Sequence, residues 1–437
     1  MNKKGVKNLA ESNNIKGKEH TKSLKPGCLE GVTILDFTWV LAGPHASKLL
    51  TDLGATVIKV EQYKTGSTER QYALQVSPNG VVQSSYSINV NRGKKSICVN
   101  LKSPKGMDII RELIAKSDAI IENFGMGVMD RLELDYESAK KIKEDIIYCS
   151  ITCFGHWGPY SHKPGYDMIA QAASGWTTQS EYPQIAPVSI GDTVAGIHAA
   201  LAIVSALYTK QAKGIGQNID ISMQDCLFTL HENSIPWYNT GQAVGESVHM
   251  DKIGRLHPGY APYGIFKGKD GLLSIANIAE SRWAPMVKVM GEKYNWLLSD
   301  SRTNTLANRC RNTTLINEIV EEWIMSFDSV KEVERILEQA GVPCMRARSV
   351  EELADNDPHI AIREMMPIVE QPFIGPMKMI GSPLKLSETP SCIRGYSPFI
   401  GEHNNKVLGE LLKYSEEQVK TLYDEDILYH EPAVERL

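Results

Sequence analysis

The chain lacks most of the short motifs that identify a catalytic chemistry. Its 437 residues contain no GxSxG nucleophile elbow, no phosphate-binding P-loop and no HExxH pair, although there are 11 histidines. These absences argue against a serine hydrolase, a P-loop enzyme and a zinc peptidase. The eight cysteines form no CxxC pair. We therefore expect free thiols in a reducing compartment and no metal site.

The chain also has little excess charge of either sign and no long apolar run. The net charge is only −5 and no basic stripe stands out, so no nucleic-acid partner is expected. The longest apolar run, 195–208, is too short to span a bilayer and contains His198. Residues 1–27 are rich in Lys, Asn and Ser and hold no hydrophobic signal segment. The composition therefore predicts a cytoplasmic protein with no membrane partner and with a mobile N-terminal tail.

From residue 30 onward, β-rich and helix-forming segments alternate, which predicts a doubly wound, Rossmann-like α/β domain with parallel strands. The predicted strands are 32–38, 56–61, 95–101, 119–124 and 145–154, with a further strand within 210–225, and the predicted helices are 43–54, 103–117 and 128–142. One long helix is expected over 223–239.

The later part of the sequence predicts a second, smaller unit. A hairpin and three helices between 254 and 345 indicate a small α+β domain, and short strands with a terminal helix follow it. The predicted layout is a tail at 1–27, the first part of the large domain at 28–225, a linker at 226–253, the small domain at 254–345, and a linker with the rest of the large domain at 346–437.

The first strand, helix and second strand are also arranged as in a dinucleotide-binding fold, with Glu61 placed to hold a ribose. That fold needs three glycines for its tight turn and close phosphate approach, and here only Gly43 is present. A nicotinamide cofactor is therefore not expected, although the crevice at the strand ends remains suitable for another nucleotide.

Two aspartates each precede a helix of small residues, Asp167 in "GYDMIAQAASG" and Asp192 in "IGDTVAGIHA". Each carboxylate is suited to cap a helix, because Asp accepts backbone N–H bonds well. The helix dipole would also keep such a carboxylate ionised, which suits a nucleophile equally. The glycine- and proline-rich loop 254–264 is similarly either a surface turn or a mobile lid. The residues alone leave both questions open.

Eight segments, in this order, resemble the family III CoA-transferases, which include the formyl-CoA and crotonobetainyl-CoA transferases. The resemblance covers roughly 28–430, and its segments are "LEGVTILDFTWVLAGP", "LGATVIKVE", "ENFGMGVMDRLEL", "GYDMIAQAASG", "IGDTVAGIHAALAIVSALY", "GIGQNIDISMQD", "GVPCMRARSVEEL" and "GEHNNKVL". Each segment is weak alone, but the set in order is specific.

The resemblance implies that Asp192 is a nucleophile that attacks an acyl-CoA thioester and carries an anhydride and then a CoA thioester. No ATP is needed, coenzyme A is a substrate, and no tightly bound cofactor is expected. Gly191 beside it is expected to let substrate approach closely. Family members form interlocked homodimers, so the same assembly is expected here.

The resemblance also implies a set of binding residues. The expected coenzyme A contacts are Leu41, Ala42, Lys102, Asn123, Phe124, Gly125, Arg131, Lys163 and Tyr166, and the expected acid pocket contains Trp39, Asp167 and Tyr260. Leu41 and Gln62 replace a glutamine and an arginine of the formyl-CoA transferases, and loop 254–264 replaces their tetraglycine lid. These departures argue against oxalate and favour a more apolar carboxylic acid.

Two alternative functions remain. The α-methylacyl-CoA racemases belong to the same superfamily, but they place a basic histidine where this chain has Tyr166. A tyrosine with an ordinary pKa of about 10 is a poor base near neutral pH, so transfer is favoured over racemisation. The second alternative is a protein that binds CoA esters without catalysis, and the presence of Asp192 argues against it.

Overall fold

A computed structural model describes residues 25–246 and 252–437, so the tail predicted at 1–27 lies almost wholly outside the described residues. The central element is a six-stranded sheet in which every neighbouring pair is parallel. Its order is β5 (Lys95–Cys98), β2 (Thr56–Glu61), β1 (Thr33–Asp36), β6 (Ala119–Glu122), β7 (Ile147–Thr152) and β8 (Gln217–Ser222). Counted along the chain, this is the order 3-2-1-4-5-6 of a Rossmann-like fold, so the predicted α/β class is confirmed.

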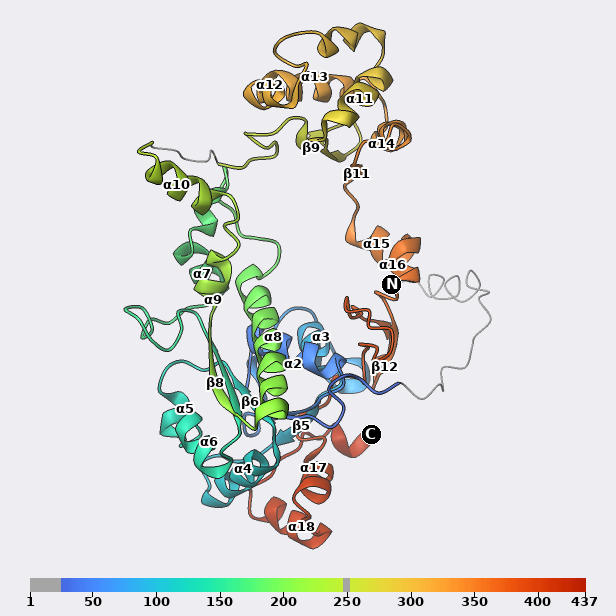
Figure 1. Cartoon of the computed structure of the whole chain (residues 1–437). Helices are drawn as coiled ribbons and strands as arrows, with labels where there is room; N and C mark the ends of the chain where they lie inside the picture. Colours follow the sequence, from blue (N-terminus) through green and yellow to red (C-terminus); the bar gives the residue numbers. More distant parts are fainter. Residues whose placement is uncertain (1–24, 247–251) are drawn as a thin grey trace.

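Helices cover both faces of this sheet (Figure 1). One face packs against α2 (Ala42–Asp52) and α8 (Ile190–Lys213), and the other against α4 (Pro104–Lys116), α17 (Asn404–Leu411) and α18 (Glu416–Asp424). Successive strand residues alternate between the two cores: Ile34 belongs to the first and Leu35 to the second. Burial on both faces explains why the strands read as nearly continuous apolar runs.

The two ends of the chain meet in the second core. Val407 and Leu422 from the C-terminal helices pack there with Ile97 and Ile110. The side chain of Asn404 also accepts a hydrogen bond from the amide of Cys98 at 2.9 Å. The C-terminal segment is therefore part of the same packed unit as the first strands.

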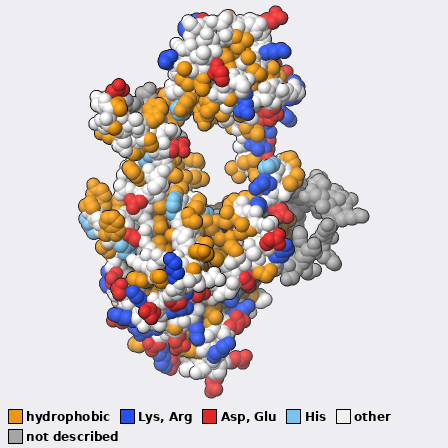
Figure 2. Space-filling model, in the orientation of Figure 1, with side chains coloured by type: hydrophobic (Ala, Val, Ile, Leu, Met, Phe, Trp, Pro, Cys, Tyr) orange, Lys and Arg blue, Asp and Glu red, His pale blue; other side chains and the backbone are white. Residues whose placement is uncertain are grey.

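A separate hydrophobic core lies entirely within residues 254–345. Strands β9 (Tyr263–Lys267), β10 (Leu272–Ala276) and β11 (Cys344–Arg346) make an antiparallel sheet, and α11 (Trp283–Met290), α13 (Thr313–Met325) and α14 (Val330–Gln339) pack against it. Figure 1 places this unit away from the six-stranded sheet, joined to it by two separate segments. Figure 2 shows an opening through the chain, framed by the two units and the two joining segments.

The remaining elements are short. They include β3 (Gln75–Val76), β4 (Gln83–Ser84), α3 (Ser85–Asn91), α7 (Asp167–Ala173), α12 (Leu306–Arg311), α15 (Val350–Asn356), α16 (Pro358–Ile362), β12 (Ile368–Gln371) and β13 (Gly375–Lys378).

Two helices predicted as continuous are interrupted. The segment 128–142 contains α5 (Val128–Arg131) and α6 (Tyr136–Ile142), because Glu133 adopts a left-handed φ of 54° and Asp135 caps the second helix through the amide of Glu137.

The segment 223–239 likewise divides into α9 (Met223–Phe228) and α10 (Ser234–Ala243). Pro236 has no amide to donate, so one continuous helix would leave a carbonyl oxygen of the preceding turn without its partner.

Among the described residues, α8 is the one helix long and apolar enough to cross a membrane. It extends beyond the apolar run 195–208 at both ends. Ala199, Ile203 and Ala206 are buried in the core beside the sheet, and its first turn contributes to the site described below. Its apolar character is thus explained, on one side, by packing within the fold.

Candidate active site

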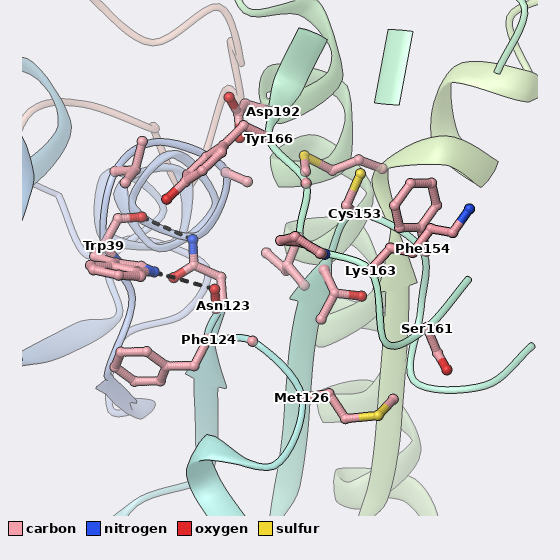
Figure 3. A pocket seen from close by; sticks show the side chains of 18 residues that line it. Trp39, Asn123, Phe124, Met126, Cys153, Phe154, Ser161, Lys163, Tyr166 and Asp192 are labelled. Atoms are coloured by element: carbon pink, nitrogen blue, oxygen red, sulfur yellow. Dashed lines mark hydrogen bonds between the residues drawn. The ribbon is translucent and has the colours of Figure 1, made fainter. Parts of the chain in front are cut away.

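The loops that follow β1 and β6 are joined at the point where the strand order reverses. Asn123 accepts the Trp39 backbone N–H through Oδ1 and donates through Nδ2 to the Trp39 carbonyl oxygen, both at 2.9 Å. The Trp39 indole N–H also donates to the Asn123 carbonyl oxygen at 3.3 Å (Figure 3). Ligands of open α/β sheets bind at this kind of position. The Asn123 side chain therefore shapes the crevice and has its amide occupied by the protein.

A cavity of about 170 Å³ opens beside these loops (Figure 3). Eight of the residues expected from the sequence line it: Trp39, Ala42, Asn123, Phe124, Gly125, Lys163, Tyr166 and Asp192. These come from the loops after β1, β6 and β7 and from the first turn of α8. The structure thus brings together most of the expected site from segments far apart in the chain.

A second cavity, of about 390 Å³, lies on the other side of the Trp39–Phe124 pair, whose ring centroids are 5.7 Å apart. Both rings line both cavities, and Lys102 lines the second. The two cavities together give one crevice with an aromatic partition and a lysine on the far side.

Glu61 also lines the second cavity, but its carboxylate is already bound by the protein. It pairs with Arg70 and accepts the backbone N–H and the hydroxyl of Ser67 at 2.9 and 3.0 Å. Burial opposes its ionisation, but Arg70 and Lys59 overcome this and hold its pKa below the usual value. These bonds leave Glu61 poorly suited to hold a ribose.

Four expected residues line neither cavity. Leu41 precedes the first residue of α2, and Arg131 is an exposed residue at the end of α5. Tyr260 packs against His257 and Tyr263, with ring centroids 4.7 and 6.2 Å away, in the unit around 254–345. The fourth is Asp167. Within one chain, the structure therefore does not bring these four side chains to the crevice.

Asp192 is the third residue of α8, and Ser189 occupies the N-cap position. Asp192 is therefore not the cap of its own helix. Its side chain is buried, with the whole residue 9% exposed. Burial, followed by the charge of Asp167, raises its pKa from 3.8 to about 7, while a backbone hydrogen bond from Ala42 acts in the opposite direction. The expectation of a carboxylate kept fully ionised by the helix dipole is therefore wrong.

Asp167 is bound to the residue that precedes Asp192. It is the first residue of α7, and its Oδ1 accepts the amide N–H of Gly191 at 2.7 Å while Oδ2 accepts Gln171 Nε2 at 2.6 Å. A side chain at Gly191 would place its Cβ 3.0 Å from Asp167 Oδ1 and 3.2 Å from Leu227. The glycine thus admits Asp167 to the first turn of α8, and the close approach expected there is made by the protein.

Sequence reasoning missed several residues around Asp192. Val40 and Cys153 line the first cavity, and the charge of Asp192 contributes to raising the pKa of Cys153 and of Tyr86, to about 11 and about 12, after burial as the main cause. These residues belong to separate segments with no common motif, so only the fold shows that they are neighbours.

The chain matches the sequence model of CoA-transferase family III over residues 29–404 and belongs to that family. Formyl-CoA:oxalate CoA-transferase of Rhodopseudomonas palustris (strain BisA53) is 33% identical over 423 residues, which cover 92% of this chain and 97% of that enzyme. Succinyl-CoA:glutarate CoA-transferase of Mus musculus is 33% identical over 417 residues, covering 92% and 89%.

A comparison with solved structures also finds proteins of this kind. The crystal structure of a CAIB/BAIF family protein from Brucella suis has a TM-score of 0.77 and 30% sequence identity to this chain, covering 89% of it and 100% of that protein. The protein is accordingly a CoA-transferase, an enzyme of acyl-CoA metabolism whose substrates include CoA esters.

Proposed function

We propose that this enzyme moves CoA from an acyl-CoA to a free carboxylic acid through covalent intermediates on Asp192, without ATP. One observation carries this proposal. Among the described residues that line the first cavity, Asp192 is the only carboxylate, and the start of α2 donates a backbone hydrogen bond to it. A buried carboxylate beside an oriented amide is suited to nucleophilic attack on a thioester.

In the proposed reaction, a carboxylate oxygen of Asp192 attacks the thioester carbonyl and expels CoA thiolate, giving a mixed anhydride. The thiolate then attacks the aspartyl carbonyl, which releases the donor acid and leaves an aspartyl-CoA thioester. The carboxylate of the second acid attacks this thioester, breaks its C–S bond to expel CoA thiolate again, and forms a second anhydride. The thiolate finally attacks the carbonyl of the second acid and frees Asp192. Each thioester broken is matched by one formed, so no ATP is consumed.

The two cavities suggest how coenzyme A lies. We assign the nucleotide to the second cavity, where the Lys102 ammonium is suited to a phosphate, and the thiol arm to the first, past Phe124 and Gly125 toward Asp192. Lys163 and Tyr166 line the approach. Contacts from Leu41 and Arg131 remain expectations from the family resemblance.

We infer the chemical class of the carboxylic acid substrate from the residues that line the first cavity. Val40, Met126, Ile151 and Met223 line the first cavity, which favours an acid with an apolar chain over oxalate. Lys163 is the one cation among its described lining residues. A panel of carboxylic acids supplied with several acyl-CoA donors, read by mass spectrometry, identifies the pair.

We further propose an interlocked homodimer in the cytoplasm, with large domains at 28–225 and 346–437 and a small domain at 254–345 joined by the linkers. The opening through the chain in Figure 2 supports this proposal, because a second chain has to pass through such an opening in an interlocked dimer. Exposed Ile197, Leu201 and Tyr208 lie on one side of α8 at helical spacing, as an interface would require. In such a dimer Tyr260 and loop 254–264 could serve the partner's site.

The covalent mechanism is tested by trapping. Incubation with acyl-CoA followed by hydroxylamine and peptide mapping should mark Asp192, and Asp192→Ala should remain folded and lose transfer. Asp167→Asn is the matched control, because the label on Asp192 should persist when the neighbouring carboxylate is removed. A label on Asp167, or near-normal turnover of folded Asp192→Ala, would contradict the proposal.

Racemisation of the acyl α-carbon is the second candidate, because a pKa of about 7 would also suit Asp192 as a general base. A racemase needs a base on each face of that carbon, and the described lining residues include no second carboxylate and no histidine. In D₂O, the enzyme should therefore introduce no α-deuterium into acyl-CoA. Fast exchange without CoA transfer to any acid would favour racemisation instead.

A further inference from the structure

The turn between β1 and α2 has an unusual backbone. Val40 adopts a left-handed φ of 62°, which a β-branched residue strongly disfavours, and Leu41 follows at φ −136° and ψ −56°. Strained residues of this kind persist only where their surroundings hold them, and they concentrate at functional sites. Val40 lines the cavity that contains Asp192, and Ala42, two residues later, provides the backbone hydrogen bond to Asp192.

A buried ion pair between Lys59 and Glu69 holds this turn in place. Glu69 Oε2 accepts the Val40 N–H at 3.1 Å, and Glu69 Oε1 lies 3.0 Å from Lys59 Nζ. Lys59 Nζ also donates to the Thr38 carbonyl oxygen at 2.8 Å. The side chains of Lys59 and Glu69 are both fully buried. The pair therefore fixes the peptide groups on both sides of Trp39.

The Glu69 carboxylate accepts further hydrogen bonds. Its Oε1 accepts the Ser67 hydroxyl at 2.5 Å and the Asn91 side-chain amide at 3.1 Å. Lys59 and these two donors offset its burial and lower its pKa to about 2, so it is ionised throughout the working range. Glu69 lines neither cavity, and it therefore has no route to the substrates.

We propose that Glu69 is a positioning residue for the transfer reaction: by holding the Val40 amide, it keeps the Ala42 N–H directed at the Asp192 carboxylate. This inference rests on the proposed role of Asp192. The first amides of a helix have no partner within the helix, so the Ala42 N–H is available to the carboxylate. The same N–H is suited to stabilise the oxyanion that forms when the aspartyl carbonyl is attacked.

Replacement of Glu69 by Gln tests this role, because glutamine retains the shape but has only one acceptor oxygen. It cannot accept both from the Val40 N–H and from the donors that surround Oε1, which are Lys59, Ser67 and Asn91. We expect kcat to fall by about tenfold, the size of one lost hydrogen bond, with little change in KM for acyl-CoA. Val40→Gly in the Glu69→Gln background should restore most of the activity, because glycine adopts a φ of 62° without support.

A readout that needs no turnover separates this inference from the proposed function. The ¹³C NMR titration of Asp192, assigned with Asp192→Asn, should move to higher pH in Glu69→Gln and return in Val40→Gly/Glu69→Gln. Asp167, Tyr166, Tyr86 and Cys153 also surround Asp192, and none of them is changed in these variants. If the wild type transfers no CoA, the proposed function fails while the titration still tests the positioning.

Asp52→Asn is the control for a general loss of buried charge. Asp52 pairs with Arg92 at 2.6 Å inside the same region, and its side chain makes no hydrogen bond or ion pair with the turn at 38–41 within the described part of the chain. It should lower stability and leave both the titration and kcat/KM ratio unchanged. If Glu69→Gln does not fold, the double variant Lys59→Met/Glu69→Gln replaces it, because removing both partners leaves no unpaired Lys59 ammonium. The same titration and kcat are then compared with those of the wild type. An unshifted titration, or a loss of kcat that Val40→Gly does not restore, would overturn the inference.

Discussion

Asp192, the proposed nucleophile, is a carboxyl group whose ionised form the fold disfavours. Only the carboxylate form attacks, and with a pKa of about 7 this form is the minor one in mildly acidic solution. We therefore expect kcat/KM for transfer to rise with pH through about 7 and to level off above it. Asp167→Asn removes the neighbouring negative charge and keeps an acceptor for Gly191, so the rise should move to lower pH. A profile from pH 5 to 8.5 that is flat, or that does not move in Asp167→Asn, would contradict this.

The same raised pKa has a consequence for stability. The folded state binds the Asp192 proton more tightly than the unfolded state, so this group's contribution to the free energy of unfolding falls as pH rises from about 4 to about 7. A shift from 3.8 to about 7 corresponds to at most about 4 kcal/mol. Asp192→Asn should therefore be more stable than the wild type at pH 8. Urea denaturation at pH 8 and pH 4.5 checks this, because the gain should largely disappear at the lower pH.

At the scale of elements, the crossing of α2 and α8 brings Ala42 to Asp192. Gly196 lies at this crossing, and a Cβ there would be 2.7 Å from the Ala42 carbonyl oxygen and 3.0 Å from His45. Gly196→Ala should therefore lower the free energy of unfolding by roughly 1–3 kcal/mol and reduce transfer, since the helices must separate.

Gly409 in α17 offers a matched control, because the nearest atom to its added Cβ is 3.8 Å away. Gly409→Ala should stabilise the protein by roughly 0.5–1 kcal/mol and leave transfer unchanged. Thermal denaturation of the two variants gives the comparison. Equal effects of the two substitutions would show that the crossing is not as tight as the structure indicates.

The sequence predicts elements well where burial fixes their pattern. Most strands of the six-stranded sheet read as apolar runs because both faces are covered, and all six lie within the predicted ranges. The interruption near 133 depends on one left-handed residue and one cap, which periodicity does not show. The prediction that Asp192 is the nucleophile comes from the family resemblance, since a capping aspartate and a nucleophile have the same local sequence. The support from Glu69 to Val40 crosses 29 residues and follows only from the fold.

At the scale of the whole molecule, the proposed interlocked dimer makes a prediction about exchange. Two chains that pass through each other's openings cannot separate while both remain folded, however dilute the solution. Differently tagged preparations mixed under native conditions should therefore form no mixed dimers over days. Denaturation and refolding of the mixture should give about half mixed dimers by random pairing. Affinity capture on one tag and detection of the other measures this. Rapid native exchange would indicate a simple surface-paired dimer, and a single-chain mass in light scattering would exclude the dimer altogether.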